Sequence, residues 1–197
     1  MGAPGESGES ARLFVGLPLG PELGALAHAR VAAVLDPSHW RLPRAEGLHL
    51  TLAFLGDQPR ARLPELSRIF GEALSGAPRP ALVLSGAGGF PRRGAERVLW
   101  LGVREEPAGA ARLAELHRRA LAAAAAAGID LGDEARRPYR PHVTVARPRR
   151  APGRAPEAFH ALALELAFAP AEALLLESVQ GPGPPIYTPR AAFPLPA

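Results

Sequence analysis

Two short stretches of the sequence repeat the order His, apolar residue, Thr, apolar residue. The first is His49-Leu50-Thr51-Leu52 and the second is His142-Val143-Thr144-Val145. Histidine titrates near neutral pH, so a pair of histidines can supply an acid and a base on opposite sides of one reacting centre. Threonine hydroxyls can donate hydrogen bonds to the charged oxygens of a phosphoryl group. These residue types therefore indicate a site where a phosphate group reacts by proton transfer.

The first stretch is predicted to be a β-strand, over residues 47–55. Side chains alternate between the two faces of a strand, which places His49 and Thr51 on one face. The same alternation places Leu50, Leu52 and Phe54 on the opposite face. We therefore expect the polar pair to face a site and the apolar residues to face the core.

The second stretch divides in the same way, with His142 and Thr144 on one face. Arg147 follows this motif directly and is a candidate phosphate contact. Strict alternation turns its side chain away from His142, unless a β-bulge intervenes. The other four histidines, His28, His39, His117 and His160, are predicted to be surface or packing residues.

The composition removes several competing chemistries. The chain has no cysteine, which excludes thiol catalysis and cysteine-bound zinc, and no lysine, which excludes a phosphate-binding loop of the Gly-x-x-x-x-Gly-Lys type. Neither motif carries the carboxylate or third histidine of a mononuclear zinc site, so we expect no metal and no cofactor. The net charge of +4 and the pI near 10.8 are compatible with an anionic substrate.

The remaining sequence predicts the elements that must position the motifs. Residues 1–10 are predicted to be a disordered tail and residues 11–197 a single domain of the α+β class. Neither a signal peptide nor a membrane span is evident, so we expect a cytoplasmic protein. Besides the motif strands, we expect strands at 12–17, 81–85, 98–103, 161–169, 174–179 and from 186, helices at 21–35, 63–74 and 109–127, and loops at 86–94 and 147–154.

With these motifs in this order, the chain resembles the two-histidine phosphoesterase superfamily. Within it, the chain is similar to the bacterial and archaeal RNA 2′,3′-cyclic phosphodiesterases, historically called 2′-5′ RNA ligases. The resemblance covers essentially residues 11–195. The stretches that carry it are Arg12-Leu13-Phe14, His49 to Gly56, Val98 to Gly102, Pro141 to Thr144 and Tyr187-Thr188-Pro189.

The resemblance implies a bilobal fold in which two pseudo-symmetric lobes each contribute an antiparallel sheet backed by helices, with the site in a cleft between them. It also implies metal-independent hydrolysis of an RNA 2′,3′-cyclic phosphate to a 2′-phosphate. His49 would be the general acid, His142 the general base, and Thr51 and Thr144 would hold the phosphate oxygens. The reverse reaction would form a 2′-5′ RNA bond.

Further substrate contacts are predicted at Arg147, and at Phe90 and Tyr187, whose rings could stack on a base. The expected partners are RNA with a 2′,3′-cyclic phosphate end or small cyclic nucleotides, without a membrane, and the protein is expected to be a monomer. Two alternatives remain open. One keeps the chemistry but acts on a small cyclic nucleotide or an ADP-ribose cyclic phosphate, and the other is a non-catalytic RNA-binding module that uses the arginine-rich loop.

Overall fold

The computed structural model of the chain describes residues 9–107, 111–132, 136–150, 152–181 and 183–197. Most of the predicted N-terminal tail therefore lies outside the described residues. Its last residue does not belong to a tail, because Ser10 begins the first strand and pairs with Pro59. No helix in the described part of the chain is long and apolar enough to cross a membrane.

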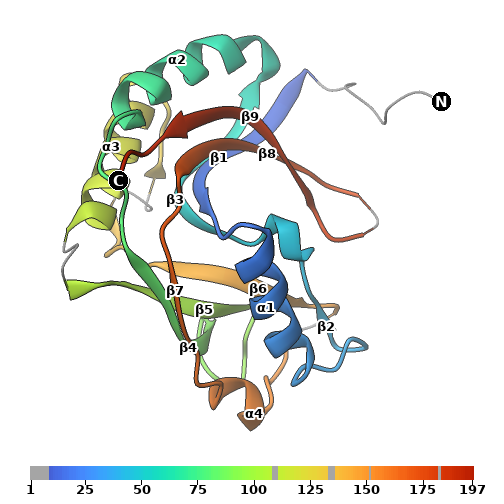
Figure 1. Cartoon of the computed structure of the whole chain (residues 1–197). Coiled ribbons are helices and arrows are strands. Elements are labelled where there is room, and N and C mark those ends of the chain that lie inside the picture. The colour runs from blue at the N-terminus through green and yellow to red at the C-terminus, as the bar shows by residue number, and fades with distance from the viewer. Residues whose placement is uncertain (1–8, 108–110, 133–135, 151, 182) are drawn as a thin grey trace.

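The helices are interspersed among the strands along the chain, as Figure 1 shows. The strands are β1 (Ser10–Pro18), β2 (Trp40–Arg41), β3 (His49–Pro59), β4 (Leu82–Phe90), β5 (Val98–Glu105), β6 (His142–Pro148), β7 (Glu165–Phe168), β8 (Glu172–Val179) and β9 (Ile186–Pro194). The α-helices are α1 (Pro21–Ala32), α2 (Leu63–Leu74), α3 (Arg112–Ala126) and α4 (Glu157–His160), and short 3-10 turns are η1 (Ala45–Gly47) and η2 (Arg60–Arg62).

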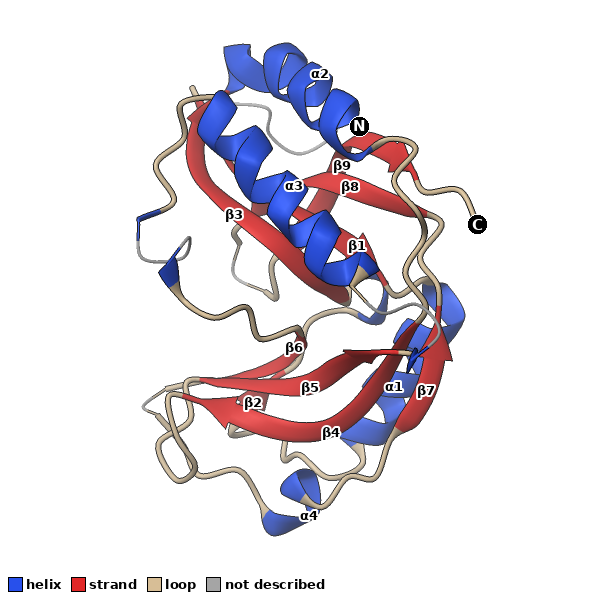
Figure 2. Ribbon diagram, turned by 90° about the vertical axis from the view of Figure 1, so that its left-hand side faces the viewer, coloured by secondary structure: helices blue, strands red, loops and turns tan. Residues whose placement is uncertain are grey.

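The strands form one curled antiparallel sheet in the order β7-β4-β5-β6-β3-β1-β8-β9, with β2 added at the end of β6. The order is symmetric, because each motif strand is the innermost of four strands. Helices α2 and α3 lie on the half that contains β3, and α1 lies on the half that contains β6 (Figure 2). The α+β class and the division into two similar halves are therefore confirmed, and the motif strands are neighbours at the junction.

The predicted loop 86–94 is wrong in its first half, because β4 continues to Phe90 and pairs with β5 as a hairpin. Glycine is usually a loop signal, but here the glycines serve packing within a strand. Gly86 adopts a φ of 68° at a bulge, and a Cβ at Gly88 would lie 2.4 Å from the Trp100 ring. Near the C-terminus, the predicted strand 161–169 is reduced to β7.

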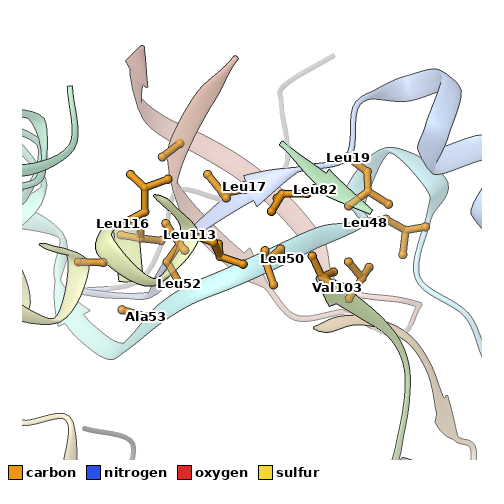
Figure 3. Close-up of a cluster of buried hydrophobic side chains, with 14 of the residues drawn as sticks. Leu17, Leu19, Leu48, Leu50, Leu52, Ala53, Leu82, Val103, Leu113 and Leu116 are labelled. Atoms are coloured by element: carbon orange, nitrogen blue, oxygen red, sulfur yellow. The ribbon is translucent and has the colours of Figure 1, made fainter. Parts of the chain in front are cut away.

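The apolar faces of the motif strands lie on the hydrophobic core. Leu50 and Val143 are completely buried, and Leu52 is nearly so. Figure 3 shows these β3 leucines packed with Leu17 of β1 and Leu113 of α3. Burying each such leucine contributes roughly 2 kcal/mol, so the core fixes which face of each motif strand remains available to a site.

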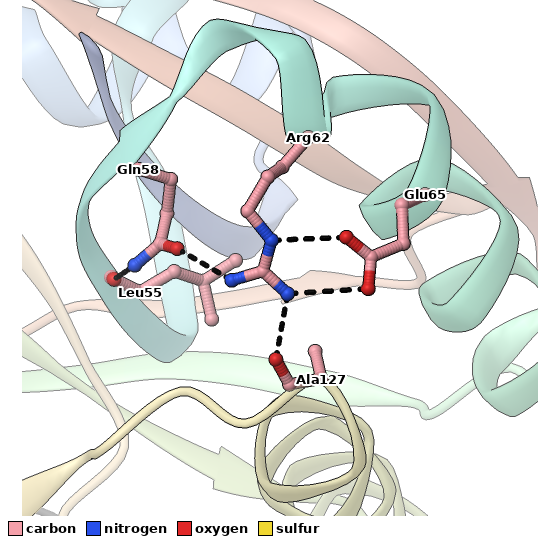
Figure 4. Close-up of polar contacts among 5 residues, drawn as sticks. All are labelled: Leu55, Gln58, Arg62, Glu65 and Ala127. Carbon is pink, nitrogen blue, oxygen red and sulfur yellow. Dashed lines mark hydrogen bonds and ion pairs between the residues drawn. The ribbon is translucent and has the colours of Figure 1, made fainter.

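The far end of β3 is tied to two helices through one arginine (Figure 4). The Arg62 guanidinium pairs with Glu65 in the first turn of α2 and donates to the Gln58 side chain at 3.1 Å. It also donates to the backbone carbonyl of Ala127, at the end of α3, at 2.6 Å. These contacts hold β3, α2 and α3 together as one unit.

Candidate active site

The two motif strands meet at the centre of the sheet. Leu50 of β3 lies opposite Val143 of β6, and the strands run antiparallel. Extending this register by one residue places His49 next to Thr144, and Thr51 next to His142. The structure therefore brings together the four motif residues that the sequence predicted, with each histidine beside the threonine of the other motif.

Just past this pair, two backbone carbonyls of β3 accept hydrogen bonds from side chains. The Tyr139 hydroxyl donates to the carbonyl of Thr51 at 2.9 Å, and His117 Nδ1 donates to that of Leu52 at 2.8 Å. The two rings are stacked with their centroids 3.8 Å apart. His117 is thus the packing residue that was predicted, whereas Tyr139 was not singled out by any local pattern.

Both motif histidines are oriented by the same backbone contact. His49 Nδ1 lies 2.7 Å from the carbonyl oxygen of Gly47, and His142 Nδ1 lies 2.7 Å from that of Arg140. A carbonyl oxygen only accepts hydrogen bonds, so each Nδ1 must carry the proton. In the neutral ring the lone pair is then on Nε2, which leaves that nitrogen of both rings to act as acid or base.

His49 lies among aromatic rings. The Phe14 ring stacks on it at a centroid distance of 4.6 Å, and the Tyr187 ring meets it edge-on at 4.8 Å. The pKa of His49 is lowered to about 4, chiefly by burial and also by the nearby His142, while the hydrogen bond to the Gly47 carbonyl opposes the shift. His49 is therefore neutral near pH 7 when no anion is bound.

Tyr187, a predicted base-stacking residue, forms one wall beside His49. A Cβ at Gly47 would lie 3.0 Å from its ring, so a larger residue at this position would require the ring to shift. Burial raises the pKa of the Tyr187 phenol, and the charge of Arg147 lowers it. The phenol is therefore neutral at physiological pH, and Arg147 is close enough to influence it electrostatically.

His142 has an aromatic wall of its own. The Phe90 ring meets it edge-on at 5.2 Å, and the Trp100 ring lies 6.3 Å away. Phe90 also packs against Trp100 at 5.5 Å. Phe90 and Tyr187, both predicted contacts, thus lie beside different histidines, while Trp100 adds an aromatic neighbour that sequence reasoning missed.

A β-bulge in β6 decides the direction of Arg147. The register between β5 and β6 shifts between Leu99 and Trp100, which leaves Val145 as an extra residue in β6. One extra residue reverses the alternation of side chains beyond it. Arg147 is therefore exposed on the same side of β6 as His142, the condition under which the sequence allowed it to contact a phosphate.

The same bulge occurs in β3, and it corrects one prediction. The register between β1 and β3 shifts between Val15 and Gly16, which leaves Leu52 as the extra residue. Phe54 therefore does not share the core face with the leucines, as strict alternation predicted. Its side chain is 50% exposed and its ring lies 6.0 Å from that of Phe14, on the side of His49.

The predicted loop 147–154 begins later than expected, because its first two residues belong to β6. Arg147 pairs with Arg41 and Pro148 pairs with Trp40, both in β2. Arg41 Nη1 also donates to the Gly183 carbonyl at 3.4 Å. Arg41 therefore joins Arg147 at this end of the site, although nothing in the local sequence marked it. Among the described residues, no group of three or more His, Cys, Asp or Glu is arranged to hold a metal ion.

Comparisons with known sequences identify the family of the chain. A family model described as the 2′-5′ RNA ligase superfamily matches residues 20–180. The chain is 36% identical to an RNA 2′,3′-cyclic phosphodiesterase of Escherichia coli K12, covering 71% of this chain and 73% of that protein. It is 34% identical to the protein of the same name from Thermus thermophilus, covering 93% and 90%. A third relative of that name, from Geobacillus stearothermophilus, is 35% identical over 76% of this chain, which spans only 46% of that protein.

Solved structures show the same fold. TT0787 of Thermus thermophilus superposes with a TM-score of 0.76 at 27% identity, covering 93% of this chain and 97% of that one. Escherichia coli LigT complexed with 3′-AMP superposes with a TM-score of 0.74 at 32% identity, covering 95% and 99%. With its paired motifs at the centre of this symmetric sheet, the chain belongs to the 2′-5′ RNA ligase superfamily.

Proposed function

We propose that the chain is an RNA 2′,3′-cyclic phosphodiesterase that hydrolyses the cyclic end to a 2′-phosphate. The family and the shared name of three curated relatives support this activity. The 3′-AMP complex of Escherichia coli LigT shows that a nucleotide binds to a protein of this fold. We place the reaction in the cytoplasm, and the protein acts as a monomer without a metal or cofactor.

One observation carries the mechanism. The two motif histidines are held by equivalent Nδ1 hydrogen bonds, and they flank the Leu50–Val143 pair from opposite strands. Two Nε2 atoms related in this way can carry out the two proton transfers of an in-line displacement at phosphorus. One takes a proton from the entering oxygen, and the other gives a proton to the leaving oxygen. The threonines beside them are placed to donate to the phosphate oxygens that carry the negative charge.

The steps follow from this arrangement. His142 Nε2 takes a proton from water, and the oxygen of that water attacks phosphorus. The bond from phosphorus to the 3′ oxygen breaks, and protonated His49 Nε2 gives its proton to the departing oxygen. The phosphate stays on the 2′ oxygen, and Thr51 and Thr144 hold its other oxygens. The same sequence, with a 5′-hydroxyl in place of water, joins the cyclic end to a second RNA chain through a 2′-5′ bond.

The role of His49 as acid requires that the substrate alter its protonation. The pKa of His49 is about 4 in the free protein, which leaves little of the protonated form near pH 7. A bound phosphate is negatively charged, and an opposite charge within a few ångströms raises the pKa of histidine by roughly 1 to 3 units. The bound substrate thus favours the protonated form of His49, which is the acid of the reaction. Arg147 limits this rise in pKa, because its positive charge offsets part of the negative charge of the phosphate.

The experiment is product analysis on a panel of cyclic phosphates. The wild-type protein should open an RNA 2′,3′-cyclic phosphate in the presence of EDTA and leave the phosphate on the 2′ oxygen. A 3′-phosphate product would reverse the leaving-group assignment, and loss of activity in EDTA would contradict metal independence. Faster opening of a free cyclic nucleotide or of an ADP-ribose cyclic phosphate would move the substrate to those classes. RNA binding without turnover would favour the non-catalytic alternative.

A further inference from the structure

A pocket separate from the candidate active site lies beyond the end of β6. It encloses about 470 Å³ between the segment 36–40 and the segments 148–150 and 152–156. Its charged lining consists of Arg149, Arg150 and Arg154 together with Asp36 and His39. We call this the arginine pocket. It contains none of the histidines, threonines or aromatic residues that form the candidate active site.

The walls of the arginine pocket are anchored at both ends. At one end, the Arg149 backbone N–H donates to the carbonyl of His39 at 2.9 Å, and its Nε donates to that of Pro37 at 2.6 Å. At the other end, Gly153 and Glu96 exchange backbone hydrogen bonds of 2.9 and 3.1 Å. Hydrogen bonds to the rest of the fold therefore hold the walls of the pocket in position.

Packing and a buried carboxylate reinforce the second anchor. A Cβ at Gly153 would lie 3.2 Å from the ring of Trp40, which forms part of the pocket lining. The Glu96 carboxylate is fully buried, accepts the Gly94 N–H at 2.9 Å and lies 3.2 Å from His160 Nε2. The Glu96 carboxylate therefore makes its contacts beneath the pocket wall, and these contacts help to hold the wall around Gly153 in place.

The charge balance of the arginine pocket favours an anion. The Asp36 carboxylate accepts the Ser38 N–H at 2.8 Å and lies 2.9 Å from His39 Nδ1, and hydrogen bonding to the Ser38 side chain and backbone and to His39 lowers its pKa to about 2. It is therefore already hydrogen-bonded by its own loop. Within the part of the chain that the structure describes, Arg150 and Arg154 form no ion pair with a carboxylate. Guanidinium groups of this kind bind phosphate strongly, because their geometry matches its oxygens.

The position of the arginine pocket indicates which phosphate it would bind. The strand β6 runs from His142 in the candidate active site to Pro148 at the pocket. Seven residues of extended chain separate His142 from Arg149, on the order of 20 Å. Arg147 and Arg41 lie between, at the β2 end of β6. A single nucleotide bound at the histidines is too short to span this distance, whereas an RNA chain several nucleotides long is not.

We propose that the arginine pocket binds backbone phosphates of the RNA chain whose cyclic end lies at His49 and His142. This inference rests on the proposed function for the placement of that end. Arg150 and Arg154 then contribute affinity that depends on substrate length, and they take no part in the reaction. The protein thereby prefers cyclic phosphates on RNA chains to free cyclic nucleotides.

The test compares the double variant Arg150→Gln/Arg154→Gln with the wild type on two substrates. One is a hexanucleotide ending in a 2′,3′-cyclic phosphate, and the other is the corresponding cyclic mononucleotide. For the hexanucleotide, we expect KM to rise about 10-fold in the variant, with kcat unchanged. The salt dependence of log(kcat/KM) should also become shallower by about 1.4, from roughly 0.7 per phosphate contact on a single strand. For the mononucleotide, both constants should match the wild type.

A matched control removes two arginines elsewhere. Arg68→Gln/Arg118→Gln loses the same number of positive charges, but on α2 and α3, where both arginines form exposed ion pairs. This control variant should behave as the wild type on both substrates. Equal loss in the two double variants would reduce the effect to net charge and overturn the proposal, as would a wild-type KM for the hexanucleotide in Arg150→Gln/Arg154→Gln.

A binding measurement separates this proposal from the proposed function. If the wild type opened neither substrate, the proposed function would fail. The arginine pocket would still be tested by the fluorescence anisotropy of a labelled hexanucleotide bearing a terminal 3′-phosphate. Weaker binding in Arg150→Gln/Arg154→Gln than in the control variant would support the pocket as an RNA site, and equal binding would reject it.

Discussion

Leu50 of β3 lies directly opposite Val143 of β6, and this pair is where the two halves of the sheet meet. Both side chains are completely buried, so the junction belongs to the core while the flanking histidines and threonines face outward. Each half follows the same plan, including a bulge in the motif strand. The similarity ends at Phe54 and Arg147, which follow equivalent bulges and make one end of the site apolar and the other cationic.

The pKa of His49 should depend on bound anion. We expect NMR titration of the free protein to give a pKa near 4, because burial disfavours the charged ring. Saturation with a nucleotide 2′-phosphate should raise this pKa by roughly 1 to 3 units. Inorganic chloride at the same ionic strength is the control. An unchanged pKa in the complex would mean that the phosphate does not lie beside His49.

The same partly buried ring should make folding sensitive to acid. The ordinary pKa of His49 is 6.5, so above that pH the ring is neutral in both the folded and the unfolded chain and has no effect. As the pH falls from 6.5 towards 4, the unfolded chain takes up a proton that the folded chain resists. The free energy of unfolding should therefore decrease by up to about 3 kcal/mol across this range. Urea titrations of His49→Gln should show a smaller decrease, and an identical decrease would contradict the assignment.

Arg147 should contribute to substrate binding through its charge. We expect Arg147→Gln to lower kcat/KM for a cyclic mononucleotide about 10-fold, because a charge-assisted contact to phosphate is lost. Steady-state kinetics would measure this, with Arg68→Gln on α2 as the control. Wild-type kinetics in Arg147→Gln would show that the bulge does not bring this side chain to the substrate.

The junction itself should be sensitive to a loss of volume. We expect Leu50→Ala to decrease the free energy of unfolding by about 2 to 5 kcal/mol, because it leaves a cavity between the two halves. Leu26→Ala removes the same atoms from a side chain that is 41% exposed, and should cost much less. Chemical denaturation would compare them, and similar costs would contradict the central position of Leu50.

The sequence predicted the features that depend on local patterns. The paired motifs identified all four central residues, and the amphipathic spacing of 63–74 gave the bounds of α2 as the structure has them. The strands β4 and β5 were also predicted, although the glycines of β4 hid its last five residues. These features are predictable because the residues that determine them are close together in the chain.

The features that the sequence missed depend on partners elsewhere in the chain. A bulge is defined by the register with a neighbouring strand, so neither motif alone could show that Phe54 turns towards His49. Tyr139 reaches the Thr51 carbonyl across the fold, without a local signal. The arginine pocket likewise forms only because the segment 36–40 meets the segments 148–150 and 152–156. Such relationships follow from tertiary packing.

The most direct test of the two-histidine mechanism is the turnover of His49→Ala and His142→Ala on an RNA 2′,3′-cyclic phosphate. Each substitution removes one of the two proton transfers, so kcat should fall by about 10² to 10⁴ in each variant. Circular dichroism should confirm that both variants remain folded. Turnover close to that of the wild type in either folded variant would contradict the account.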